Sequence, residues 1–287
     1  MDLIWQVLLN GIFLGGLYAL MALGLALVWG VLNIVNLAHG AFIMLGAYAC
    51  YYLYTGAHID PFAALPLTMV MVFLLGYVIQ RYVLNLIVRS AMFNTLLITF
   101  GIDVVLTYVA QIAFSADFRT INPPYAGSNF QLLGATVPTV QLLTFVVAIA
   151  VTVALSVFLF KARLGRAIRA TAQNLDAARL YGVDPRTLYA LTFALGAALA
   201  GAAGGLYGLV SQINPYIGAP LTAKSFAIAI IGGLENPLGV IVGGLFLGIV
   251  ESFTALYIGP TYTSVASFGI LVLVLIVRPT GILGRTA

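Results

Sequence analysis

Polar side chains recur at every fourth position of one otherwise apolar segment. Thr95, Thr99, Asp103 and Thr107 share this spacing, so a helix would place them along one face. A carboxyl group and hydroxyl groups on one face can exchange hydrogen bonds with a polar molecule or an ion. Such groups are costly inside a membrane and commonly mark substrate or ion pathways. The stripe therefore predicts that Thr95, Thr99 and Asp103 line a pathway.

A second polar group lies between the first two apolar segments. Asn33, Asn36 and His39 are spaced i, i+3, i+6, and Gly30 and Gly40 flank them. The glycines would allow a break in the helix at this point. Two interpretations stay open. The three side chains line an unwound section of a pathway, or they form interhelical hydrogen bonds that only lock the turn.

Two further charged residues lie in or near apolar segments. Pairing Lys224 with either Glu251 or Asp103 would neutralise both partners. We expect a structural ion pair here, and the sequence leaves open which carboxylate Lys224 meets.

The residue types do not favour catalysis. His39 and His58 are the only histidines, and neither accompanies a nucleophile–base or paired-carboxylate motif. Cys50 is the single cysteine, so we expect no intrachain disulfide and no metal-ligand cluster. We therefore expect neither an enzyme nor a cofactor or metal bound to this chain.

The composition is typical of a helical membrane protein. Hydrophobic residues make up 62% of the chain and charged residues 7%, against about 25% charged in an average soluble domain. Apolar segments of about 20 residues, the length that crosses a hydrocarbon layer of roughly 30 Å, recur throughout. We predict an all-α polytopic transmembrane bundle of eight to nine spans in a single domain, 1–287. The candidate spans are 7–32, 37–54, 62–80, 91–114, 139–160, 188–210, 217–233, 237–258 and 262–277.

Two of these segments are candidates for broken or re-entrant helices. The segment 37–54 is short, and 217–233 contains Pro220 and Lys224. Glycines four residues apart, at 11/15, 201/205, 204/208, 239/243 and 244/248, would let helices approach closely in lipid. Packing within the chain, a subunit contact and sliding helices all remain open as their purpose. No sequence repeat is apparent.

The basic residues orient the chain. Six of the twelve Lys and Arg residues lie between Lys161 and Arg186. Because cytoplasmic loops carry an excess of Lys and Arg, we expect 161–187, the turn 81–89 and the C-terminal tail to be cytoplasmic. The loops 115–138 and 211–216 are then external. The N-terminus is also external if all nine segments span, and one re-entrant segment would reverse that expectation.

The stretch 161–187 also predicts a short helix. Asn174 can cap it, and Gly182 with Pro185 beyond it can end it. One interpretation is a solvated connecting loop that only sets topology. However, Ala177, Ala178, Leu180 and Tyr181 would give such a helix an apolar side, which favours docking on a partner protein.

Motifs along the whole chain resemble one family, the LivH-type permease subunits of branched-chain amino acid ABC importers. The matching motifs are 16–24 (GLYALMALG), 29–33 (WGVLN), 36–40 (NLAHG), 164–170 (LGRAIRA), 178–182 (ARLYG), 231–239 (IGGLENPLG) and 278–284 (RPTGILG).

This resemblance implies the ABC-importer permease type of fold in a bacterial cytoplasmic membrane, with a cytoplasmic C-terminus. It also implies four kinds of partner: a second related permease, two cytoplasmic ATPase subunits, an external substrate-binding protein and the lipid bilayer. ATP and magnesium would be bound by the ATPase subunits, and the chain indeed has no phosphate-binding Gly-x-x-x-x-Gly-Lys-Ser/Thr loop. The residues expected to couple to the ATPase are Arg166, Arg169, Asn174, Asp176, Ala177, Ala178, Arg179, Leu180, Tyr181 and Gly182.

The resemblance implies ATP-driven alternating access for branched-chain or related hydrophobic amino acids. Urea, short amides and aromatic acids remain open as cargo, since relatives with these cargoes share the motifs. An ion-coupled secondary transporter is the alternative from another class. It would need a carboxylate-lined ion site near the midplane, for which Asp103 and Glu251 give thin support, and it leaves the capped helix unexplained.

Overall fold

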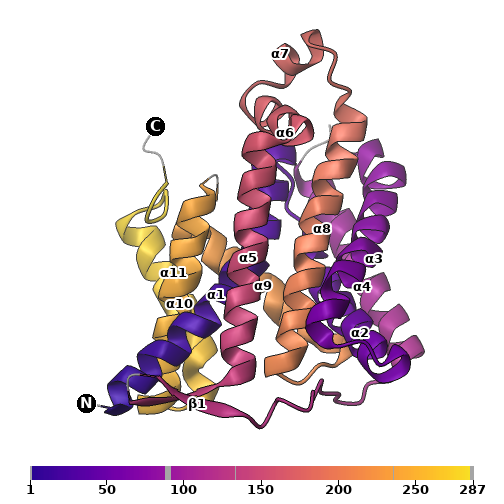
Figure 1. Cartoon of the computed structure of the whole chain (residues 1–287). Coiled ribbons are helices and arrows are strands. Elements are labelled where there is room, and N and C mark those ends of the chain that lie inside the picture. The colour runs from indigo at the N-terminus through magenta and orange to yellow at the C-terminus, as the bar shows by residue number, and fades with distance from the viewer. Residues whose placement is uncertain (1, 88–91, 133, 235, 285–287) are drawn as a thin grey trace.

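The computed structural model describes residues 2–87, 92–132, 134–234 and 236–284, which form an almost entirely helical bundle (Figure 1). Arg89 and Arg285, two of the residues used to orient the chain, lie outside the described residues. The helices are α1 (Asp2–Leu32), α2 (His39–Ala57), α3 (Pro61–Tyr82), α4 (Met92–Phe114), α5 (Thr139–Lys161), α6 (Arg163–Gln173), α7 (Leu175–Leu180), α8 (Pro185–Val210), α9 (Gly218–Gly232), α10 (Pro237–Tyr257) and α11 (Thr263–Val277). Three 3-10 turns, η1 (Leu84–Leu86), η2 (Pro215–Ile217) and η3 (Pro260–Tyr262), and one antiparallel hairpin, β1 (Asn129–Leu132) with β2 (Ala135–Pro138), complete the chain.

Within the described residues, seven helices are long and apolar enough to cross a membrane: α1, α3, α4, α5, α8, α10, and α11 together with the turn η3, which spans Pro260–Val277 with 18 residues. The expected count of eight to nine spans is therefore not confirmed. The two segments that fall short are the ones the sequence marks as broken. Helix α9 has 15 residues, which reach only about 22 Å, and α2 carries Tyr48, Tyr51, Tyr52 and Tyr54 among its apolar residues.

Three of the long helices begin at the same local signal. In Asp60-Pro61, Asp184-Pro185 and Asn236-Pro237, the first side chain accepts a hydrogen bond from a backbone N–H of the first turn. Proline fits the first helical position because its missing N–H would have no partner there. These pairs fix where α3, α8 and α10 start.

The first four helices and the last four form an inverted structural repeat. In each half, a long central helix is followed by a break and a shorter helix: α1, 33–38 and α2, then α8, 211–217 and α9. Most residues of α1 and α8 are buried, whereas few residues of α4 and α11, the fourth helix of each half, are buried. Figure 1 shows α1 and α8 beginning at opposite ends of the molecule.

Glycines make the equivalent contacts in the two halves. Helix α1 packs antiparallel on α10, with Gly11 against Gly248 and Gly15 against Gly244. Its counterpart α8 packs antiparallel on α3, where Gly201 meets Val72. The breaks also meet, because Gly40 at the start of α2 lies against Gly218 at the start of α9. The glycines therefore serve packing within the chain at these positions.

The two ends of the bundle differ (Figure 1). Helices α6 and α7 cap one end, toward which α11 runs, and the β1–β2 hairpin and the start of α1 lie at the other. Gln6 ties the N-terminus to the hairpin, since its amide both donates to Thr136 O and accepts from Thr136 N at 2.8 Å. Arg119 and Ile213 exchange two backbone hydrogen bonds of 2.9 Å, so the loops 115–138 and 211–216 share this hairpin end.

Candidate functional sites

The stretch 161–187 contains two helices, although the sequence predicted only the second. Helix α6 folds back onto the end of α5, where Gly165 lies against Leu159 and Ile168 is buried. Arg169 fixes this arrangement: its Nε donates to Leu159 O at 3.0 Å, and its guanidinium lies 4.4 Å from the centre of the Phe160 ring. Four of the basic residues here therefore belong to, or flank, a structured amphipathic helix: Lys161, Arg163, Arg166 and Arg169.

Helix α7 has the ends that the sequence predicted. Asn174 Oδ1 accepts from Ala177 N at 2.9 Å, and Gly182 adopts a left-handed φ of 83° just beyond the helix. Asp176 and Arg179 form an exposed ion pair of 2.9 Å, an interaction that adds little stability.

The predicted apolar side of α7 is divided. Ala178 is buried against the chain's own fold and Ala177 is exposed, whereas Leu180 and Tyr181 are 89% and 90% exposed. Two large neighbouring apolar side chains at a solvent-facing tip favour an interaction surface. We call Leu180 and Tyr181 the α7 tip.

The return from α7 into α8 is anchored at two points. Asp184 caps α8 by accepting from Arg186 N at 3.2 Å, Thr187 N at 3.1 Å and Thr187 Oγ1 at 2.6 Å. The Thr187 hydroxyl and the backbone donors hold the pKa of the Asp184 carboxyl below its usual value. Asn85, beyond α3, donates to Arg186 O at 3.0 Å. The α6–α7 segment is therefore joined firmly to α5 on one side and to α8 and α3 on the other.

The break between α1 and α2 does not bring its three polar residues together. Asn33 ends α1 with a left-handed φ of 53° and is exposed. His39 is buried, and its Nε2 donates to Met21 O at 2.8 Å. Asn36 is also buried, and its Oδ1 has no hydrogen-bond partner among the described residues. The predicted break is confirmed, whereas a shared pathway lining stays a prediction.

The polar stripe of α4 is likewise divided. Thr95 is buried and donates to Met92 O at 2.7 Å. Thr99 is buried against the break: it can donate to Val35 O at 2.9 Å and accepts from Leu37 N at 3.2 Å. Asp103 is partly exposed, and its Oδ1 has no partner within the described part of the chain. Thr99 thus holds the break in place, and Asp103 has one carboxyl oxygen without a partner among the described residues.

Lys224 pairs with Glu251 rather than with Asp103. Lys224 Nζ lies 2.9 Å from Glu251 Oε2, and Tyr18 OH donates to the same oxygen at 2.6 Å. Ser267 donates to the other oxygen, Glu251 Oε1. This ionic cluster of Tyr18, Lys224, Glu251 and Ser267 joins α1, α9, α10 and α11. No sequence pattern pointed to Tyr18 or Ser267, because neither lies near the charged residues along the chain.

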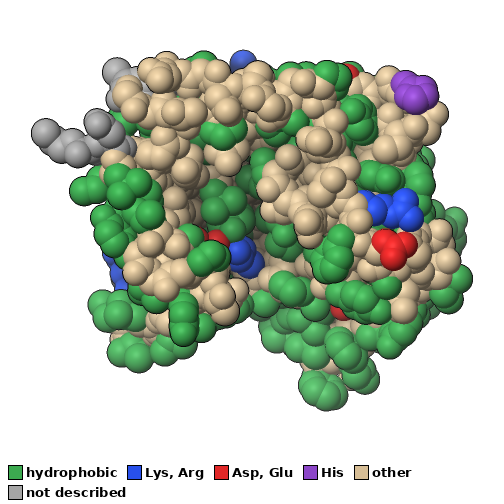
Figure 2. All heavy atoms as spheres, turned by 90° about the horizontal axis from the view of Figure 1, so that it is seen from below, with side chains coloured by type: hydrophobic (Ala, Val, Ile, Leu, Met, Phe, Trp, Pro, Cys, Tyr) green, Lys and Arg blue, Asp and Glu red, His purple; other side chains and the backbone are tan. Residues whose placement is uncertain are grey.

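The hairpin end is hollowed at its centre. Figure 2 views the molecule from this end, and side chains of both charges are visible inside the hollow. The hollow and the α7 tip are therefore at opposite ends of the bundle.

Comparison with known proteins gives one consistent family. The model of the family described as "branched-chain amino acid transport system / permease component" matches residues 7–275. The chain is 35% identical to the high-affinity branched-chain amino acid transport system permease protein BraD of Pseudomonas aeruginosa, over 98% of this chain and 95% of BraD. It is 34% identical to the corresponding permease protein LivH of Escherichia coli K12, over 98% of this chain and 95% of LivH. The permease protein LivM of Escherichia coli K12 is 27% identical, over 94% of this chain and 68% of LivM. No solved structure matches the chain significantly.

Proposed function

Because the chain belongs to the family of permease components of branched-chain amino acid transport systems, we propose that it is the membrane-spanning subunit of an ABC importer. In this proposal it moves branched-chain or related hydrophobic amino acids into the cytoplasm. ATP hydrolysis is performed by partner subunits, and the chain itself is not an enzyme.

The exposed α7 tip is the observation that supports coupling to an ATPase. Leu180 and Tyr181 project from a capped helix whose neighbours are hydrogen-bonded to α5 and α8. A force applied to the tip is therefore transmitted to two membrane-spanning helices rather than absorbed by a loose loop. Asp176 is exposed on the same helix and supplies a polar group for the same contact, and Arg166 is an exposed basic residue of the preceding helix α6.

The second permease has support from the comparisons, since LivM is named as a permease protein of the high-affinity branched-chain amino acid transport system and is itself similar to this chain. We propose that a related permease pairs with this chain. We also propose that the hairpin end, with loops 115–138 and 211–216, faces outward and receives a substrate-binding protein. The α6–α7 segment and the C-terminus then face the cytoplasm, as the basic residues predict.

The position of the α6–α7 segment supports a mechanism of alternating access. Closure of two ATPase subunits on ATP would push the α7 tips of the paired permeases and tilt α5 and α8. Helix α8 contacts α1, α2 and α3 through glycines and other small residues, and such surfaces allow close packing in more than one arrangement. The break residues Asn33, Asn36 and His39 and the α4 residues Thr95, Thr99 and Asp103 remain the proposed pathway candidates.

Co-purification and uptake test this function. The chain would be expressed with its neighbouring ATPase and permease genes, isolated in mild detergent and reconstituted in liposomes with the binding protein. Leu180→Glu and Tyr181→Glu should release the ATPase and abolish leucine uptake. Leu238→Glu, at a 69% exposed position at the start of α10 and outside the α6–α7 segment, is the matched control and should retain both.

Ion-gradient-driven uptake by the chain alone, without ATP, would show instead that it is a secondary transporter. Competition by unlabelled compounds then identifies the cargo. Leucine, isoleucine and valine should displace labelled leucine, and urea, short amides and aromatic acids should not.

A further inference from the structure

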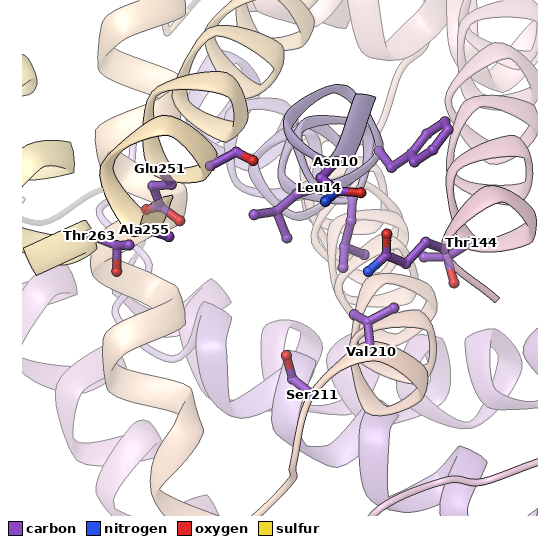
Figure 3. Close-up of a pocket in the computed structure, with 12 residues that line it drawn as sticks. Asn10, Leu14, Thr144, Val210, Ser211, Glu251, Ala255 and Thr263 are labelled. Atoms are coloured by element: carbon purple, nitrogen blue, oxygen red, sulfur yellow. The ribbon is translucent and has the colours of Figure 1, made fainter. Parts of the chain in front are cut away.

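A cavity of about 260 Å³ lies among α1, α5, α8, α10 and the start of α11. Figure 3 shows its labelled lining residues around open space: Asn10, Leu14, Thr144, Val210, Ser211 and Glu251. Ser211 directly follows α8 and Thr263 begins α11, which places the cavity toward the hairpin end. Since one water molecule needs only about 10–15 Å³, the cavity has room for a ligand the size of an amino acid.

The walls of the cavity differ in chemistry. Phe13, Leu14 and Leu17 give the α1 side an apolar surface. The α5 side carries Gln141 and Thr144, whose Oε1 and Oγ1 are buried without a hydrogen-bond partner among the described residues. Unsatisfied buried oxygens destabilise a fold. A side-chain rotation that offers these groups to a ligand would remove that cost.

One member of an internal pair of opposite charges lines the cavity, and the other is bonded to it from α9. Glu251 belongs to the lining, and Lys224 binds it at 2.9 Å. The Lys224 side chain is 19% exposed, compared with 4% for Glu251, so the lysine is not sealed off. Tyr18 and Ser267 also donate hydrogen bonds to the Glu251 carboxylate, so it keeps two donors when the lysine moves away.

We propose that this cavity binds the cargo as a zwitterionic aliphatic amino acid that inserts between Lys224 and Glu251. Glu251 accepts hydrogen bonds from the ligand ammonium, and Lys224 donates to the ligand carboxylate. The branched hydrocarbon lies against Phe13, Leu14 and Leu17. This inference rests on the proposed transport function and names the site within it.

Charge balance is the reason for choosing a zwitterion. A buried charge left without a partner is strongly destabilising. A zwitterion gives each member of the pair a new opposite charge when it separates them, and charge-assisted hydrogen bonds replace the one that is lost. Urea and short amides carry no charges for this exchange, and an aromatic acid without an amino group satisfies only the lysine.

Cysteine protection tests the site directly in the assembled complex, without the binding protein. Ser211→Cys places a thiol in the cavity wall, and a small membrane-impermeant thiol reagent reports its accessibility. The native Cys50 is fully buried, so the wild-type chain gives the background. Leucine at about ten times its dissociation constant should slow labelling about tenfold, because the free fraction falls in that proportion.

Ligand analogues separate ion-pair exchange from simple apolar binding. Isoamylamine lacks the carboxylate of leucine, and 4-methylpentanoate lacks the ammonium. Both should protect the thiol at least about tenfold more weakly than leucine, since each loses a charge-assisted hydrogen bond. Equal protection by all three compounds would overturn the exchange, and no protection by any of them would overturn the site.

Two variants distinguish this inference from the proposed function. Leu14→Trp fills the cavity and should abolish both leucine protection and uptake. Leu74→Trp, at an exposed apolar position on α3, is the matched control and should change neither. Normal ATP-driven uptake by Leu14→Trp would refute the cavity alone, whereas a wild-type complex that takes up no branched-chain amino acid would refute the proposed function.

Discussion

Lys224 Nζ and Glu251 Oε2 lie 2.9 Å apart between a short broken helix, α9, and a full span, α10. Tyr18 from α1 bonds to both, with its hydroxyl 2.8 Å from Lys224 Nζ and 2.6 Å from Glu251 Oε2. Since α9 is too short to span, its position in the bundle depends on such lateral contacts. The pair therefore fixes α9 as well as neutralising two charges.

A double-mutant cycle should reveal strong coupling between the two charges. Lys224→Met or Glu251→Gln alone leaves one buried charge unpaired, which typically costs about 3–5 kcal/mol. The double substitution should cost clearly less than the sum of the two. Thermal unfolding in detergent measures this, and additive losses would show that the two side chains do not stabilise each other.

The sequence predicted the elements well and their relations less well. Apolar length located the long helices, and Asn174 and Gly182 located α7. The sequence could not predict whether Lys224 pairs with Asp103 or with Glu251, because the answer depends on α9 lying beside α10. Tyr18 and Ser267 were missed for the same reason. The 163–173 helix was not predicted, because its arginines were interpreted only as a sign that the stretch is cytoplasmic. Leu164, Ile168 and Thr171 nevertheless have helical spacing.

The inverted repeat was invisible in the sequence for a physical reason. In a repeat of this kind, the order and packing of the helices are the same in both halves. Small residues where helices cross are enough to maintain that packing, so the two halves need no similar sequence. Gly40 and Gly218 meet just after the two breaks, yet the residues around them differ, because His39 follows the first break and Pro215 lies in the second. Only the three-dimensional contacts relate the two halves.

Alanine substitutions should destabilise the protein at glycines where two helices pack closely and should not do so at glycines that face open space. A Cβ on Gly40 would collide with Gly218 O, and one on Gly204 would collide with Ile43 O, so both alanine variants should lose at least about 1–3 kcal/mol. Gly101 and Gly269 have no described neighbour within 4 Å of an added Cβ, and alanine there should be neutral or stabilising by up to about 1 kcal/mol. The yield of monodisperse protein in size-exclusion chromatography compares the four variants.

Loss of the Asn174 cap should loosen α7 without unfolding the bundle. Asn174→Ala removes the acceptor for Ala177 N and should cost about 0.5–2 kcal/mol locally, whereas Asn174→Asp keeps a capping oxygen. Hydrogen exchange of residues 175–182 should accelerate in the alanine variant only. Equal exchange in both variants would mean that another contact fixes this helix.

The first turn of α8 should weaken at acidic pH. Because hydrogen bonds from Thr187 and the backbone lower the folded-state pKa of Asp184, the ionised carboxylate is preferred in the folded chain. Its stabilisation is complete above the unfolded value of about 3.9 and is lost as pH falls through the lower folded value. Hydrogen exchange of the α8 start should therefore differ between wild type and Asp184→Asn at pH 7 and converge near the folded pKa. A constant difference at all pH values would contradict this.

Opposite labelling of the two ends should establish the orientation. Tyr181 at the α7 tip and Ser128 in the hairpin-end loop are far apart along the bundle, and Tyr181 is 90% exposed. In intact cells an impermeant thiol reagent should modify Ser128→Cys and spare Tyr181→Cys, and membrane disruption should make both reactive. The reverse pattern would place the α7 tip outside, where no ATPase could reach it.

The start of α1 should be labelled from the same side as the hairpin, because Gln6 is hydrogen-bonded to Thr136. Leu3→Cys should therefore react in intact cells, as Ser128→Cys does. Reaction of Leu3→Cys only after membrane disruption, as expected for Tyr181→Cys, would contradict the placement of the N-terminal residues at the hairpin end.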